Sequence, residues 1–157
     1  MEKIWVYQLN RALEQAEEQS LLQELHYFVA SWDAHGQLLA ARAEIRHHHF
    51  VILGVDVQKT PPSGCAVDKS VHVLKKLEER FDVRLFDRMT LACFMDEHVT
   101  LFTKSSLKEA FEQGLVNEDT PFFNNLIESY EQLETDWLIP LKNSWVFRFL
   151  ESPAPSN

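Results

Sequence analysis

Val51-Ile52-Leu53-Gly54-Val55 is an unbroken apolar run near the middle of the chain. A strand with one wet face alternates apolar and polar residues, whereas a continuous run is typical of a strand covered on both faces. We therefore predict a central strand here, in a region from Leu38 to Val57 that forms two strands or one bent pair. The stretch Thr60-Pro61-Pro62-Ser63-Gly64, which follows it, has the composition of a loop.

A first strand and two helices accompany this run. Ile4–Leu9 is rich in β-branched and aromatic residues, which favours a strand. Apolar residues at three- and four-residue spacings predict one helix from about Ala12 to Asp33 and another from about Val67 to Phe81. Gly36 follows the first helix closely and fits a helix stop.

The second half of the chain predicts shorter elements. Residues 88–95 and 98–103 have the composition of two strands around an Asp96-Glu97-His98 turn. A short helix capped by Ser105 or Ser106 is expected to run through Phe111, and residues 122–133 are predicted to be helical.

This order of elements predicts an α+β fold. We expect a mixed or mainly antiparallel sheet with two main helices packed on one face, arranged as a ferredoxin-like βαββαβ core with C-terminal helical additions. The length predicts a single domain over residues 1–150, followed by a disordered C-terminal tail over residues 151–157.

The composition indicates an acidic globular protein. Hydrophobic residues make up 45% of the 157 residues, and the formal net charge is −9. Such a charge repels the phosphates of nucleic acids and of anionic lipids. No apolar stretch approaches the ~18 residues of a membrane span, and the start Met1-Glu2-Lys3-Ile4-Trp5 lacks a signal-peptide pattern. We expect a soluble cytoplasmic protein with no nucleic-acid partner and no membrane span.

Several short motifs depart from the generic pattern: Trp5-Val6-Tyr7-Gln8, Trp32-Asp33-Ala34-His35-Gly36, Ser63-Gly64-Cys65-Ala66-Val67-Asp68-Lys69-Ser70-Val71, Leu85-Phe86-Asp87-Arg88, Phe123-Asn124-Asn125-Leu126 and Ser144-Trp145. In this order they resemble a small family of uncharacterised bacterial proteins of about this length, often labelled "ABC transporter ATPase". The resemblance covers nearly the whole chain. The family usually carries Ser where this chain has Ala66, so a hydroxyl chemistry shared with the family is in doubt here.

The ATPase label does not fit the residues. An ATPase of this kind binds the phosphates of a nucleoside triphosphate with a Gly-x-x-x-x-Gly-Lys-Ser/Thr loop after a strand. The loop after the central run, Gln58-Lys59-Thr60-Pro61-Pro62-Ser63-Gly64-Cys65, has one Gly and two Pro, and proline lacks the backbone N–H that cradles phosphate. We therefore expect no ATP hydrolysis.

The start of the second helix is the local feature that could take part in chemistry. Cys65, Asp68 and His72 lie within about 60° of one another on a helical wheel, away from the buried stripe. The helix dipole lowers the pKa of a thiol at this position, whereas a neighbouring carboxylate raises it.

Three interpretations of this helix start remain open. Cys65 is a reactive thiol, or a small packing residue beside a cap made by Ser63, or the free N–H groups bind a small anionic ligand. The candidate ligand-binding residues are Ser63, Gly64, Cys65, Asp68, Ser70, His72 and Arg88.

A histidine run offers a weaker metal hypothesis. On a strand, His47 and His49 would share a face and could bind one metal ion, although further ligands would have to come from elsewhere. The alternative is a surface strand that happens to carry histidines. For the protein as a whole, we expect no cofactor.

The sequence contains no complete catalytic set, so we predict a binding or protein-interaction module. Its partner would be another protein or a second copy of the chain. The binding surface would be an apolar patch at a sheet edge or at the C-terminal aromatics, namely Trp137, Trp145, Phe147 and Phe149. The alternative function is the small-ligand site or thiol-dependent enzyme at the second helix.

Overall fold

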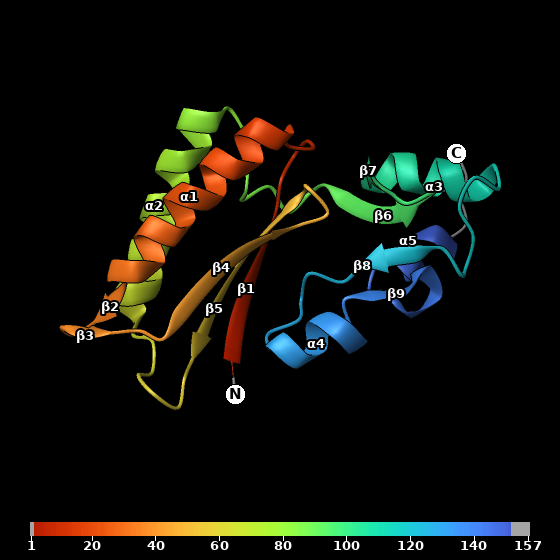
Figure 1. Ribbon diagram of the computed structural model, residues 1–157. Coiled ribbons are helices and arrows are strands. Elements are labelled where there is room, and N and C mark those ends of the chain that lie inside the picture. The colour runs from red at the N-terminus through yellow and green to blue at the C-terminus, as the bar shows by residue number, and fades with distance from the viewer. Residues whose placement is uncertain (1, 152–157) are drawn as a thin grey trace. The chain divides into compact units, whose positions relative to one another are not determined.

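The computed structural model describes residues 2–151, and these fall into two compact units. Unit 1 comprises residues 2–87 with 125–133, and unit 2 comprises residues 88–124 with 134–151. The described chain contains helices and antiparallel sheets, which confirms the predicted α+β class (Figure 1). The prediction of one domain remains a prediction. Glu151 is the last residue of a helix, and the rest of the predicted tail lies outside the described residues.

A three-stranded antiparallel sheet forms the centre of unit 1. Its strands are β1 (Glu2–Gln8), β4 (Ala41–Arg46) and β5 (Phe50–Asp56), in the order β1-β5-β4. β5 is buried from Phe50 to Val55, so the predicted central strand covered on both faces is confirmed.

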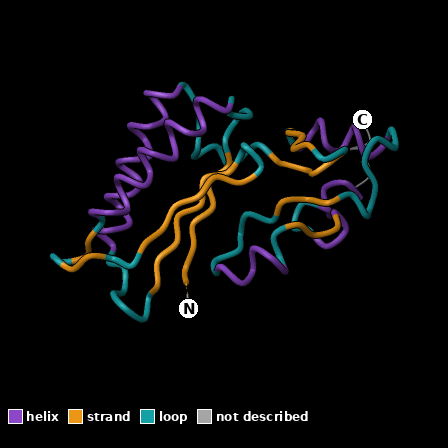
Figure 2. The backbone as a smooth tube through the Cα atoms, viewed as in Figure 1, coloured by secondary structure: helices purple, strands orange, loops and turns teal. Residues whose placement is uncertain are grey.

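Two long helices cover one face of this sheet, as predicted (Figures 1 and 2). They are α1 (Gln15–Ser31) and α2 (Gly64–Phe81), both close to their predicted ranges. The core between helices and sheet contains Leu21, Leu25 and Phe28 of α1, Leu74 and Leu77 of α2, and Val51, Leu53 and Val55 of β5. Trp32, just after α1, donates its indole N–H to the carbonyl of Ala66 in α2 at 2.8 Å, which ties the end of one helix to the start of the other.

Gly36 lies in a turn and does not stop α1. α1 ends at Ser31, and the chain then forms a small ribbon of β2 (Asp33–Ala34) and β3 (Gln37–Leu38). His35 and Gly36 join the two strands, with φ angles of 52° and 82°. A two-residue turn that matches the twist of a hairpin requires positive φ at both positions, which Gly adopts at no steric cost.

The ferredoxin-like prediction holds for the elements up to α2 and fails for the last strand. The order β1-β5-β4, with one helix after β1 and one after β5, is the arrangement expected for the first three strands. The next strand along the chain belongs to a different sheet. The place beside β1 is taken instead by residues 128–129: Ile4 donates to the carbonyl of Glu128 at 2.9 Å, and Lys3 bridges Ser129 in antiparallel orientation.

Tyr130 fixes this late segment to the second face of the sheet. Its ring lies under the Arg42 guanidinium, 3.5 Å from the centroid, and its hydroxyl donates to Glu44 Oε1 at 3.0 Å. Arg46 donates to the same carboxylate at 3.1 Å, and Arg42 pairs with Glu2 at 2.7 Å. The four charges therefore form two mutually compensating pairs around one aromatic ring.

Unit 2 is built on a four-stranded antiparallel sheet in the order β7-β6-β8-β9. The strands are β6 (Leu91–Met95), β7 (His98–Phe102), β8 (Pro121–Phe123) and β9 (Leu138–Pro140). Its helical elements are α3 (Lys104–Glu112), the 3₁₀ turn η1 (Leu141–Asn143) and α5 (Phe147–Glu151). α4 (Tyr130–Thr135) begins in unit 1, and its last two residues belong to unit 2.

The predicted helix over 122–133 is therefore wrong in its first part. Phe122 and Phe123 are adjacent and both buried, which is possible on a strand covered on two faces, and only Tyr130 onward is helical. The spacing of Leu126, Ile127, Tyr130 and Leu133 imitates a helical stripe. The predicted C-terminal helical additions are present, and the strands predicted over 88–95 and 98–103 are confirmed as β6 and β7. The sequence did not indicate that they belong to a second sheet with β8 and β9.

The contact of Tyr130 with the sheet predicts a graded loss of stability. Tyr130→Phe keeps the ring under Arg42 and removes the hydroxyl that donates to Glu44 and accepts from Arg46 Nη2 at 3.4 Å. We expect this change to cost about 0.5–1.5 kcal/mol of the free energy of unfolding for each hydrogen bond lost. Tyr130→Leu also removes the cation–π contact and is expected to cost more. Chemical denaturation measures both, and equal losses would show that the ring contributes nothing.

Candidate functional site

The start of α2 is capped in part by Ser63. Ser63 Oγ accepts the Ala66 N–H at 3.1 Å, and the Ser63 carbonyl accepts the Val67 N–H at 3.0 Å. Ser70 is buried, and its hydroxyl donates to the Val67 carbonyl at 2.6 Å. Ser63 and Ser70 therefore make local hydrogen bonds within the helix and its cap.

The remaining candidates at this helix do not form a catalytic arrangement. Cys65, Asp68 and His72 are exposed, and within residues 2–151 no hydrogen bond or ion pair joins any of them to another. Gly64 is also exposed, and Arg88 is an exposed residue of unit 2. The ligand site and the reactive thiol stay predictions.

Lys69, near the start of α2, forms an ion pair with Asp33. Its ammonium binds Asp33 Oδ1 at 3.0 Å, and the Gly36 N–H donates to the other oxygen of the same carboxylate at 3.1 Å. The Lys69 hydrogen bond and then the Gly36 N–H lower the pKa of Asp33 below its ordinary value. This pair links the β2–β3 ribbon to α2 and compensates the lysine charge.

The histidine run is a turn and not a strand, which corrects the basis of the metal hypothesis. His47 and His48 have φ angles of 54° and 59° and connect β4 to β5. Burial lowers the pKa of His47 and of His49, so both rings favour the neutral form. Among residues 2–151, no group of three or more His, Cys, Asp or Glu side chains is placed to hold a metal ion.

The turn holds the chain that enters α1. The carbonyl of His48 accepts the Leu13 N–H at 2.9 Å, and that of His49 accepts the Leu9 N–H at 2.7 Å. His48 Nδ1 lies 3.0 Å from Glu18 Oε2. The run therefore has a structural role in fixing residues 9–13.

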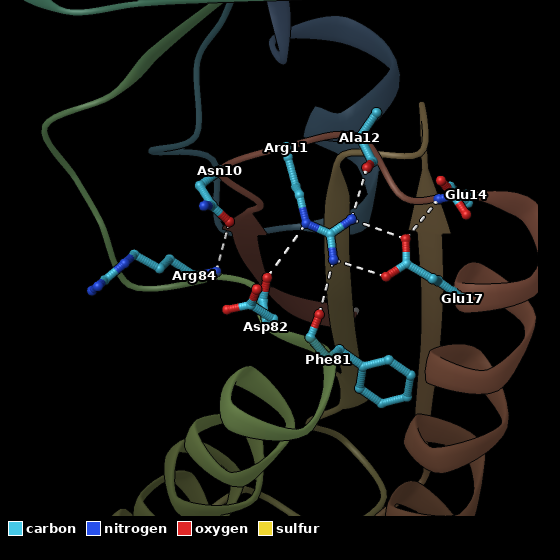
Figure 3. A network of polar contacts seen from close by, with 8 residues as sticks. All are labelled: Asn10, Arg11, Ala12, Glu14, Glu17, Phe81, Asp82 and Arg84. Carbon is cyan, nitrogen blue, oxygen red and sulfur yellow. Dashed lines mark hydrogen bonds and ion pairs between the residues drawn. The ribbon is translucent and has the colours of Figure 1, made fainter.

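A polar network around Arg11 joins the helix ends of unit 1, and the sequence did not indicate it (Figure 3). Arg11 binds both carboxylate oxygens of Glu17, in the first turn of α1, at 2.9 and 2.8 Å. It also donates to the carbonyl of Phe81, the last residue of α2, at 2.9 Å. A cation at a helix C-terminus and an anion at a helix N-terminus both compensate the helix dipoles.

The C-terminal aromatics divide between core and surface. Trp137 is buried, and Phe147 packs against the core of unit 2. Trp145 and Phe149 are 39% and 41% exposed, with their ring centroids 6.3 Å apart. The Lys104 ammonium lies 4.3 Å from the Phe149 centroid, which places a cation and two aromatic rings together on the surface of unit 2.

Each of three of the four edges of the two main sheets has at least one outward position that is bonded or blocked. The β1 edge is paired with residues 128–129. At the β4 edge, His26 of α1 bonds the Ala43 carbonyl at 3.2 Å. β9 contains Pro140, which has no N–H to offer a further strand.

β7 is the fourth edge, and none of its outward backbone groups is bonded within residues 2–151. Its hairpin with β6 closes at Met95 and His98 around Asp96 and Glu97, whose φ angles are 51° and 64°. The two residues of a closing pair bond each other, so alternate residues of β7 bond β6 and those between point outward. The outward groups belong to Val99 and Leu101, and nothing in the described part of the chain bonds them.

The residues of β7 do not protect this edge. His98-Val99-Thr100-Leu101-Phe102 contains no Lys, Arg, Asp, Glu or Pro, the residues with which proteins discourage edge pairing. α3 packs through Leu107 and Ala110 against the face of the sheet that carries Leu91 and Cys93. It therefore covers a face and leaves the backbone groups of the edge unbonded.

Comparison with protein-family models, with curated proteins and with solved structures found no match for this chain. The resemblance to the bacterial family thus remains a prediction. No helix in residues 2–151 is long and apolar enough to cross a membrane.

Burial predicts different reactivity for the two free cysteines. Cys65 is exposed, whereas burial raises the pKa of Cys93 to about 12. With a thiol reagent at pH 8 we expect one thiol per folded chain to react, and both after denaturation. Cys65→Ser is expected to abolish the reaction of the folded protein. Rapid reaction of both thiols in the native state would contradict the burial of Cys93.

The Arg11 network predicts a pH dependence of stability. The Arg11 hydrogen bond, followed by the Glu14 N–H, lowers the pKa of Glu17 from 4.5 to about 2. A lowered folded-state pKa stabilises above the unfolded value, and this contribution is lost as pH falls through the folded value. The stability advantage over Glu17→Gln should therefore shrink between about pH 5 and pH 2. Glu79→Gln, at an exposed position of α2 without an ion pair among residues 2–151, is the control.

Proposed function

We propose that this protein is an interaction module that binds an extended segment by strand addition at β7. The observation that carries the proposal is the unpaired backbone of Val99 and Leu101 on an uncharged edge strand. In strand addition, main-chain hydrogen bonds supply affinity and alternate side chains supply selectivity. This role is binding, and it requires no set of catalytic residues.

The other edges support the assignment to β7 by contrast. A protein that left all of its edges open would show no preference for one of them. Here the β1 edge is paired, the Ala43 carbonyl of β4 is capped by His26, and β9 carries Pro140. β7 lacks even this local protection, so it is the binding surface in this proposal.

Free thiols support a cytoplasmic location for the module. Cys65 and Cys93 are both unpaired, and reduced thiols are typical of the cytoplasm. The exposed rings of Trp145 and Phe149 lie in the same unit as β7 and are of the types enriched in protein interfaces.

A strand-forming probe tests the proposal. We expect a blocked synthetic peptide of alternating threonine and valine to bind saturably and to slow hydrogen exchange at the Val99 and Leu101 amides. Val99→Pro removes one outward N–H and spares the bonds to β6, so the peptide should no longer bind. Val99→Ala keeps that N–H and should retain binding.

The same probe can overturn the proposal. Without binding to the wild type, the edge is not a docking strand. Equal binding to Val99→Pro and Val99→Ala would place the peptide elsewhere on the protein. A native circular dichroism spectrum for both variants is required, because an unfolded variant would lose binding for a different reason.

A further inference from the structure

We infer that the strand added at β7 is the β7 strand of a second copy of this chain, paired antiparallel across a two-fold axis at Thr100. This inference rests on the proposed function, since it names the partner of the same edge. The unit 2 sheets of the two copies would then form one continuous sheet across the axis.

The outward backbone groups of β7 match themselves in this register. A two-fold axis at Thr100 places Val99 opposite Leu101 of the second copy, and these are the residues whose N–H and C=O groups point outward. Each such pair can exchange both hydrogen bonds. Thr100 then faces its own copy in the intervening position, where side chains approach most closely and Thr–Thr pairs are favourable.

The charges at the two ends of β7 select the antiparallel orientation. Asp96 and Glu97 precede the strand, and Lys104 follows it at the start of α3. Antiparallel pairing places the acidic turn of each copy near Lys104 of the other, so the attraction occurs twice. Parallel pairing would align acid with acid and lysine with lysine.

The acidic turn has no partner of its own in the described structure. Asp96 and Glu97 are exposed, and neither forms an ion pair within residues 2–151. Lys104 is positioned by the rings of Phe149 and Trp145, at 4.3 and 5.6 Å from their centroids. The N-terminal end of α3 adds a favourable dipole for the incoming carboxylates.

The mass of the protein in solution tests the inference. We expect sedimentation to show a mass approaching twice the 18.3 kDa of the chain as concentration rises. Val99→Pro should remain a monomer, and Val99→Ala should dimerise. A wild-type mass of one chain up to about 1 mM would overturn the inference. Dimerisation of Val99→Pro equal to that of Val99→Ala would also overturn it, because the contact would then lie elsewhere.

A cross-link tests the register. In a Cys65→Ser background, Thr100→Cys places two thiols opposite each other in a non-bonded pair, where Cα atoms lie about 4.5 Å apart, within disulfide range. Mild oxidation should yield a covalent dimer. Glu112→Cys, an exposed position at the end of α3, is the control and should stay monomeric. Equal cross-linking at both positions, or none at Thr100→Cys, would contradict the two-fold register.

Charge reversal tests the orientation. Glu97→Lys and Lys104→Glu should each weaken the dimer about tenfold, because each substitution changes both symmetry-related charge contacts. The double variant restores the attraction between positions 97 and 104 and leaves Asp96 opposite the new carboxylate, so it should recover part of the affinity. Additive weakening in the double variant would exclude this contact.

The result separates the inference from the proposed function. If the threonine–valine peptide binds the edge while the protein stays monomeric, the edge is a docking strand for another partner and the inference alone fails. If the protein remains monomeric and the peptide does not bind, both fail. If both stand, excess peptide should dissociate the dimer.

Discussion

The burial of β5 on both faces is the constraint on which unit 1 depends. A strand with apolar residues on each side must be covered twice, and its backbone must be paired on both edges. β1 and β4 supply the edges, and α1 and α2 supply one cover. Residues 125–133 return from much later in the chain to contact the other face through Tyr130 and Asn125, whose amide donates to Gln8 at 2.9 Å.

Polar side chains set the positions of the elements around this core. Arg11 links the N-terminal end of α1 to the C-terminal end of α2, and Trp32 links the two opposite ends. The helices are thus tied antiparallel at both ends, while apolar packing holds their middles. Hydrophobic contact is non-directional, so specific hydrogen bonds of this kind fix the alignment of elements that burial only brings together.

The candidate site follows from what the fold leaves unpaired. The strongest local motif in the sequence is the start of α2. Ser63 caps its Ala66 N–H, and its exposed side chains make no mutual contacts among residues 2–151. The open edge of β7 has no motif, because its outward groups are backbone atoms common to all residues except proline. Its only signals in the sequence are an alternating uncharged strand and a preceding acidic turn, and these do not reveal which edge stays uncovered.

By itself, the sequence determined α1, α2 and the double burial of β5. Apolar spacing and unbroken runs are local properties that hydrophobic burial turns directly into α1, α2 and β5. Only the tertiary structure decided that β6 leaves the first sheet, that residues 128–129 take the place beside β1, and that His47 and His48 form a turn. Pairing of strands depends on contacts between residues far apart in the chain. No local pattern encodes which distant segment competes best for an exposed edge.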